Sequence, residues 1–216
     1  MDTFLIVGFV LSIIFFFILI IFASKKSKEK RTEQLKKLAQ KRGWKFKEGK
    51  GKLDFSYVLG NYKKRPVRIG AYSRHMTTTG PGSSDIGSLY EMSFPGPRSE
   101  KIAQEYFRGG KPDVWVSPKY RRPVKGKKMK GVYSLFNDNF IVTGDKAEEL
   151  VDLDVQQKIV QLSKANNFHL TVFMPTEERD GRVFLFTSNS FKFEESFATR
   201  VLDLLEFVAG KAEKTL

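Results

Sequence analysis

Clustered positive charge is the most prominent candidate for chemistry in this chain. Residues 119–130, KYRRPVKGKKMK, hold seven cations and no acid. Dense lysine and arginine bind phosphate groups, either in nucleic acids or in anionic lipid headgroups. The segment therefore predicts a lipid- or polyanion-binding site, although a charge run can also serve solubility alone. The candidate binding residues in it are Lys119, Arg121, Arg122, Lys125, Lys127, Lys128 and Lys130.

A second basic cluster lies nearer the N-terminus. Residues 25–42 hold nine cations against two acids, and Lys25, Lys26 and Lys28 join the candidate lipid- or polyanion-binding residues. The formal net charge of the chain is +14, but it is spread unevenly. Residues 43–131 have 20 basic and 7 acidic side chains, whereas residues 132–216 have 9 basic and 14 acidic ones. We expect the first half to face an anionic surface and the second half to meet a partner.

The residues that usually perform catalysis are scarce. His75 and His169 are the only histidines and cysteine is absent, whereas a metal site needs three or four converging ligands. Residues 126–132, GKKMKGV, have the glycine spacing of a phosphate-binding loop, but Val132 and Tyr133 stand where lysine and Ser or Thr belong. Paired acids fall on expected helices and loops, where they form solvated faces. The sequence therefore predicts no enzyme, no cofactor and no metal site.

The N-terminal region is strongly apolar. Residues 4–23 contain no charged side chain, and a helix of that length spans about 30 Å of hydrocarbon. A cleaved signal peptide is the alternative, but Asp2 makes the start acidic and the apolar stretch is too long. We predict one transmembrane helix, with the N-terminus outside and the C-terminal domain in the cytoplasm, because the basic flank follows the span.

The predicted organisation has three parts. Residues 1–24 form the anchor, residues 25–42 a basic juxtamembrane helix ending near Gly43, and residues 43–216 an α+β domain whose mostly antiparallel sheet is covered by helices. The domain has a basic sub-module, 43–131, and an acidic one, 132–216. Alternating and helical periodicities predict its elements. We expect strands at 43–46, twice within 56–72 around Lys63 and Lys64, and at 86–94, 113–117, 139–144, 168–174 and 182–187, with helices near 99–108, 146–164 and 193–210.

Three short segments resemble membrane-anchored prokaryotic proteins of uncharacterised function. They are LKKLAQKRGWKF (35–46), YKKRPVRI (62–69) and NDNFIVTGD (137–145), although Lys64 stands where that family has glycine. The resemblance implies a membrane-tethered cytosolic α+β domain with no known reaction. It therefore transfers no functional residues to this chain.

These observations favour a non-enzymatic interaction or scaffold module, anchored in the membrane and facing the cytosol. Its basic surface would contact anionic lipid headgroups, and its partner would be an unidentified membrane or cytosolic protein. Two alternatives stay open. One is a membrane-tethered nucleic-acid-binding protein, which would use stacking aromatic residues beside the cations. The other is a small-molecule-sensing or hydrolytic domain with a pocket lined by Trp44, Trp115, Tyr120 or Tyr133.

Overall fold

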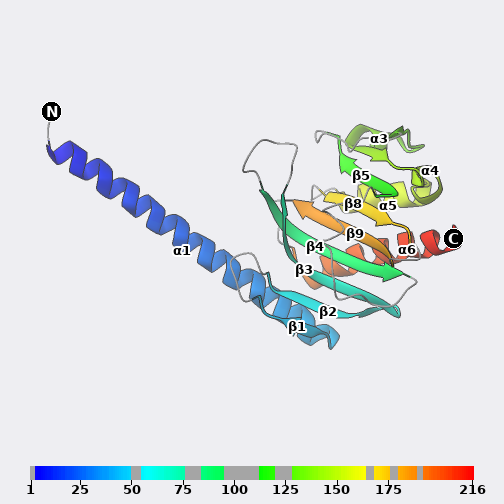
Figure 1. Ribbon diagram of the computed structural model, residues 1–216, viewed down its shortest axis with the longest axis horizontal. Helices are drawn as coiled ribbons and strands as arrows, with labels where there is room; N and C mark the ends of the chain where they lie inside the picture. Colours follow the sequence, from blue (N-terminus) through cyan, green and yellow to red (C-terminus); the bar gives the residue numbers. More distant parts are fainter. Residues whose placement is uncertain are drawn as a thin grey trace.

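A single antiparallel sheet forms the centre of the protein (Figure 1). The computed structural model describes residues 3–49, 55–75, 84–94, 112–119, 128–163, 168–175, 180–188 and 192–216. Nine strands pair in the order β1-β2-β3-β4-β9-β8-β5-β7-β6, and every pair is antiparallel. The strands are β1 (Lys45–Lys47), β2 (Tyr57–Tyr62), β3 (Arg65–His75), β4 (Ser84–Phe94), β5 (Val114–Pro118), β6 (Lys128–Met129), β7 (Phe140–Thr143), β8 (Phe168–Phe173) and β9 (Gly181–Ser188).

Helices cover one face of this sheet, so the predicted α+β arrangement is confirmed. The described helices are α1 (Thr3–Arg42), α3 (Ser134–Asn139), α4 (Ala147–Leu150), α5 (Leu153–Ser163) and α6 (Glu195–Lys214). Every second residue of the central strands packs against them, because side chains alternate between the faces of a strand. The resulting core joins Val58, Ile69, Met92, Leu185 and Leu170 to apolar side chains of α5, α6 and the end of α1.

The predicted helix at 146–164 is divided into α4 and α5. Asp152 lies between them, and its side-chain Oδ1 accepts a hydrogen bond from the backbone N–H of Val155 at 3.1 Å. This is the bond of an N-cap residue to the third residue of its helix. Asp152 thus starts a new helix within a continuous apolar pattern. The helix expected near 99–108 lies outside the described residues.

The long helix α1 corrects the prediction of a membrane anchor. It runs without interruption through the predicted boundary at residue 24, and the side chains that it buries among those described, Leu35, Leu38 and Ala39, lie near its C-terminal end. Across the part of the chain that the structure describes, no helix has the length and apolar character to cross a membrane. The predicted transmembrane helix and single-pass localisation, with the N-terminus outside and the domain in the cytoplasm, are therefore wrong on this finding.

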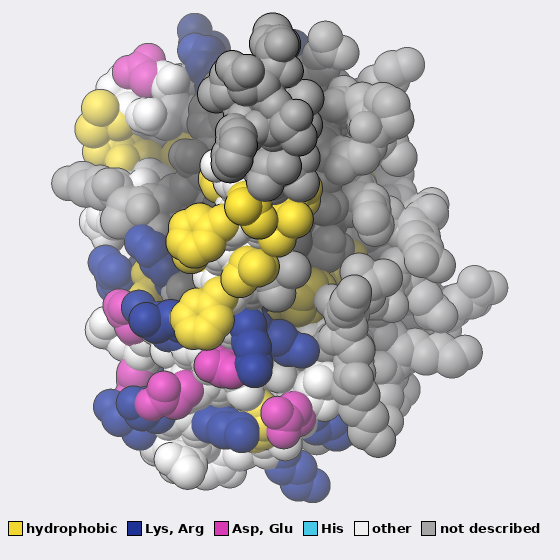
Figure 2. Space-filling view, turned by 90° about the vertical axis from the view of Figure 1, so that its left-hand side faces the viewer, with side chains coloured by type: hydrophobic (Ala, Val, Ile, Leu, Met, Phe, Trp, Pro, Cys, Tyr) yellow, Lys and Arg dark blue, Asp and Glu magenta, His cyan; other side chains and the backbone are white. Residues whose placement is uncertain are grey.

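The described apolar side chains in the N-terminal half of α1 are exposed. Figure 2 shows the end of the molecule from which α1 projects, with hydrophobic side chains gathered together and charged side chains of both signs below them. The large exposed residues of this segment include Phe9, Leu11, Phe15, Phe16, Phe17, Ile18 and Phe22.

Ion pairs join the acidic helix α6 to the basic first half of the chain. Asp203 accepts hydrogen bonds from the Tyr62 hydroxyl at 2.8 Å and from Lys63 Nζ at 2.9 Å. Arg65 donates hydrogen bonds to Glu213 from both terminal guanidinium nitrogens, and this hydrogen bonding lowers the pKa of the Glu213 carboxyl. At least part of the acidic charge that we expected to meet a partner is therefore neutralised within the chain.

The turn between β2 and β3 holds two lysines in an unfavourable backbone conformation. Lys63 has a φ of 46° and Lys64 a φ of 69°, which is the pattern of a type I′ hairpin turn that favours Asn-Gly. The ion pairs of Lys63 with Asp203 and Glu206 offset part of this strain. Lys64 is exposed and its substitution tests the strain alone.

We expect Lys64→Gly to stabilise the protein by about 1 kcal/mol, because glycine adopts a positive φ without the penalty that a side chain brings. Chemical denaturation of the full chain would measure the change. Lys64→Ala is the matched control, since alanine removes the lysine side chain but keeps the penalty, and it should leave stability nearly unchanged. A lower stability for the glycine variant would contradict this interpretation of the turn.

Candidate functional site: a cationic pocket beside strand β1

The predicted polyanion-binding residues that the structure describes lie in two separate places. Lys119 follows β5, Lys128 lies in β6, and Lys130 follows it, all exposed at one edge of the sheet. Lys25, Lys26 and Lys28 are exposed on α1, whose end packs beside β1 and β2 at the other edge (Figure 1). Arg121, Arg122, Lys125 and Lys127 lie outside the described residues.

His169 and Gly131, which the sequence offered as candidate functional residues, make contacts within the fold. His169 is buried on the sheet face opposite the helices, with ring contacts to Trp115 and Phe186. Gly131, the second glycine of the loop-like motif, is bonded through its N–H and C=O to the side chain of Asn137. Among the described side chains, no group of three or more His, Cys, Asp or Glu residues could hold a metal ion.

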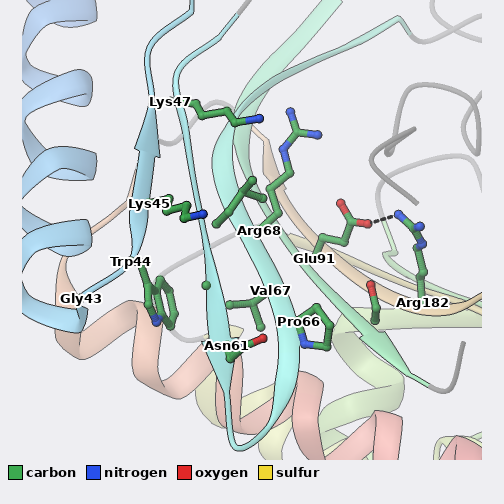
Figure 3. A pocket seen from close by; sticks show the side chains of 13 residues that line it. Gly43, Trp44, Lys45, Lys47, Asn61, Pro66, Val67, Arg68, Glu91 and Arg182 are labelled. Atoms are coloured by element: carbon green, nitrogen blue, oxygen red, sulfur yellow. Dashed lines mark hydrogen bonds and ion pairs between the residues drawn. The ribbon is translucent and has the colours of Figure 1, made fainter. Parts of the chain in front are cut away.

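A pocket of about 510 Å³ opens where β1 meets the rest of the sheet (Figure 3). Most of its lining side chains come from the face opposite the helices, which we call the second face. The described lining residues are Gly43, Trp44, Lys45, Lys47, Leu59, Gly60, Asn61, Pro66, Val67, Arg68, Glu91, Ser93 and Arg182.

A helix-ending motif places β1 at this pocket. Gly43 has a φ of 64°, its N–H donates to the carbonyl of Gln40 at 3.3 Å, and the N–H of Trp44 donates to the carbonyl of Ala39 at 2.8 Å. Both hydrogen bonds together form a Schellman motif, which reverses the chain after α1. The predicted role of Gly43 in ending the helix is thereby confirmed.

Trp44 forms one wall of the pocket because β2 has a glycine opposite it. A side chain at Gly60 would collide with the indole ring of Trp44. The guanidinium of Arg42 lies 5.1 Å from the centre of the Trp44 ring, and it is held on α6 by Thr199 and Glu195. The position of this wall therefore depends on the docking of α1 against α6.

Strand register brings three cationic side chains to the second face. Lys45 pairs with Leu59, which pairs with Arg68, and Lys47 pairs with Tyr57. The centre of the Tyr57 ring lies 3.9 Å from the guanidinium carbon of Arg68 and 5.9 Å from Lys47 Nζ. Cation–π contacts at these distances are attractive and restrict where the cations lie. In Figure 3 the side chains of Lys45 and Lys47 extend from β1 toward Arg68.

A buried ion pair forms the deep end of the pocket. Glu91 and Arg182, from the adjacent strands β4 and β9, are only 3% and 1% exposed. Arg182 donates a hydrogen bond to Oε1 of Glu91 and lies 3.7 Å from Asp180. Burial raises the pKa of the Glu91 carboxyl, and the charges of Arg182 and Arg68 oppose that rise.

Sequence reasoning found only one wall of this pocket. Trp44 was predicted to line a pocket and does so. Trp115 and Tyr133 are not among the described lining residues, and Tyr120 lies outside the part of the chain that the structure describes. Lys45, Lys47, Arg68, Glu91 and Arg182 were missed. One signal was present, because Arg182 is the only charge in β9 and Glu91 the only charge within residues 86–94, and such charges are seldom buried without a partner.

Comparisons with known proteins add little to this description. No protein-family model matches the chain, and no curated protein matches it. Among solved structures, the crystal structure of the mycobacterial trehalose monomycolate transport factor A, TtfA, aligns with a TM-score of 0.48 at 11% identity, over 82% of this chain and 95% of that chain. A likeness at this level identifies neither a family nor an activity.

The ion pair predicts a non-additive effect on stability. Arg182→Met should destabilise the protein by about 3–5 kcal/mol, because it leaves the buried Glu91 carboxylate without its counter-ion. Replacing both residues, as Glu91→Leu with Arg182→Met, should recover much of that loss. The measurement is denaturant unfolding of the two single variants and the double variant.

The exposed pair of Lys146 and Glu149, 2.9 Å apart, provides the control. Lys146→Met should change stability by less than about 1 kcal/mol, since solvent screens this pair. Equal effects of Arg182→Met and Lys146→Met would show that the buried pair does not support the second face.

Proposed function

We propose that this protein is a non-catalytic binding module and that the pocket beside β1 binds a small ligand with an anionic group, such as a phosphate. The observation that carries the proposal is the charge of the pocket. Four cations and one acid line it among the described residues, and Arg182 already neutralises that acid. The exposed side chains of Lys45 and Lys47 therefore supply positive charge that a ligand can use.

Two of these cations suit anion recognition. Arg68 lines the same pocket, and Tyr57 restricts its orientation. Lys45 and Lys47 are exposed point charges that attract and hold an anion from the solvent side. Because they are exposed, salt should weaken binding.

This proposal keeps the predicted interaction module but gives its binding site a different place. The sequence pointed to residues 119–130 because their cations are adjacent along the chain. In the described structure, Lys119 and Lys128 are at the far edge of the sheet, where β5, β7 and β6 lie. Lys45 and Lys47 instead share a pocket with Arg68, which lies in another strand.

The test is titration of the full chain with inorganic phosphate at low salt, in a nonionic detergent that covers the exposed apolar side chains of α1. Trp44 lines the pocket and Trp115 is the other tryptophan, so a Trp115→Phe background isolates the fluorescence of Trp44. Replacing Lys45 and Lys47 by glutamine should weaken phosphate binding at least about tenfold, because hydrogen bonds to charged groups contribute about 1.5–3 kcal/mol each.

The matched control replaces Lys128 and Lys130 by glutamine, which removes the same charge at the other edge of the sheet. We expect this variant to keep the parent affinity within about twofold, apart from the weak long-range effect of charge. A tenfold loss in the control with none in the pocket variant would return the site to the 119–130 segment. Absence of phosphate binding to the parent protein would contradict the proposal altogether.

A further inference from the structure

The pocket beside β1 is larger than an anionic group alone requires. Its volume of about 510 Å³ lies in the range of sites that enclose a whole small molecule, whereas inorganic phosphate fills only a small part of such a space. The lining extends along β2 from the level of Lys47, which pairs with Tyr57, to Asn61, a distance of about 13 Å. The pocket therefore has room for a ligand with a body besides its anionic group.

Apolar side chains of the lining are available to that body. Leu59 is partly exposed and belongs to neither of the two hydrophobic clusters that the described residues form. Pro66 and Trp44 also line the pocket and are partly exposed. Covering such surface with apolar atoms is favourable, because both surfaces leave water. The described lining thus favours an apolar body.

The cations and the apolar residues occupy different parts of the pocket. In Figure 3, Lys47 lies in the upper part, whereas Trp44 and Pro66 lie in the lower part. Strand register agrees, because Lys47 pairs with Tyr57 and Pro66 pairs with Asn61, four residues farther along β2. The arrangement fits a molecule with an anionic group at one end and an apolar body at the other.

Gly43 leaves space at the apolar end. It lines the pocket, and a side chain in its place would meet no atom within 4 Å. Lys45 is at the level of Leu59, and Pro66 at the level of Asn61. These two levels are two residues apart on β2, or about 7 Å, which is within the reach of a short aliphatic chain.

From these observations we infer that the ligand is a phosphate ester with an apolar body, whose phosphate lies on Lys45 and Lys47 and whose body lies over Leu59 toward Pro66 and Trp44. The inference rests on the proposed function, because it specifies the ligand of the same pocket. A short soluble alkyl phosphate and the phosphate end of a single-chain lipid share this chemistry.

Three phosphate esters test the inference on the unaltered protein. Methyl phosphate supplies the anion with the smallest body, n-butyl phosphate adds three methylenes, and glycerol 3-phosphate has a body of similar length that carries hydroxyls. On the full chain in nonionic detergent, we expect n-butyl phosphate to bind about tenfold more tightly than methyl phosphate. Each fully buried methylene strengthens binding about fourfold, and the open pocket buries the three only in part. Glycerol 3-phosphate should bind no more tightly than methyl phosphate, since apolar side chains offer its hydroxyls no hydrogen bond.

A substitution at Leu59 assigns the preference to the second face. Leu59→Asn keeps the approximate size of the side chain but removes its apolar surface, so the preference for n-butyl over methyl phosphate should fall below about threefold. Leu135→Asn is the matched control, because Leu135 is exposed in α3 and is not a lining residue, and it should keep the tenfold preference. Thermal unfolding shows whether Leu59→Asn is folded, and if it is not, the three-ester comparison on the parent protein decides alone.

Competition against bound n-butyl phosphate separates the two sources of the ligand. n-Decyl phosphate, which resembles a single-chain lipid, displaces it if the site takes the end of a lipid. The ligands are compared at equal free concentrations, which equilibrium dialysis sets, so that uptake into detergent micelles does not affect the result. Failure of n-decyl phosphate to compete would assign the site to short soluble esters. Both results retain a phosphate ester with an apolar body.

The inference is overturned if n-butyl phosphate binds no more tightly than methyl phosphate, if glycerol 3-phosphate binds most tightly, or if folded Leu59→Asn keeps the full preference. In each case binding of methyl phosphate that depends on Lys45 and Lys47 would leave the anion-binding function intact. If none of the three esters binds, the proposed function fails and this inference fails with it.

Discussion

The register of the antiparallel sheet is the constraint on which the rest of the structure depends. It aligns residues of all nine strands in one row across the second face, from Lys45 in β1 to Lys128 in β6. Between them lie Leu59, Arg68, Glu91, Phe184, Thr171, Trp115 and Thr143. A shift of one residue in any strand would move its apolar residues to the second face and its polar ones into the core. The helix-covered core and the charged pocket are thus two results of the same alignment.

Ion pairs inside the chain account for part of the uneven distribution of charge along the sequence. Basic side chains of the first half, in the β2–β3 hairpin and at the end of α1, pair with acidic side chains of α6. Lys211 of α6 pairs in turn with Asp152, at the start of α5. These contacts hold α1 and the hairpin on the helix layer, and through Arg42 they position Trp44. The cations of the pocket lie on the opposite face of the sheet, where α6 supplies no acid to neutralise them.

Much of the fold could be predicted from the sequence because its periodicities are strong. Alternation of apolar residues identified β3, β8 and β9, and the apolar stripe of α6 identified that helix, although it begins and ends a few residues later than expected. The place of β5 between β7 and β8 could not be predicted, since strand order depends on contacts between distant residues. The membrane anchor was predicted from the length of the apolar stretch, its lack of charge and the basic flank that follows it, and the described structure contains no helix that meets the requirement.

The site was harder to predict, for a physical reason. Density of charge along the chain selected residues 119–130, whereas a pocket depends on which strands are neighbours. Arg182 and Glu91 are 91 residues apart in sequence, and Lys45 and Lys47 look like ordinary exposed strand residues until Arg68 is placed beside them. Trp44 could be predicted as a pocket residue because its aromatic type and its place next to a helix-ending glycine are visible in the sequence, without knowledge of its neighbours in space.

The most direct test of the account is to map the backbone amide signals that shift when inorganic phosphate is added to the ¹⁵N-labelled full chain in nonionic detergent. The account predicts that the shifts concentrate in β1, in Leu59–Asn61 of β2 and around Arg68 of β3, which meet only in the folded sheet. Shifts confined to residues 119–130, with β1 unchanged, would contradict it.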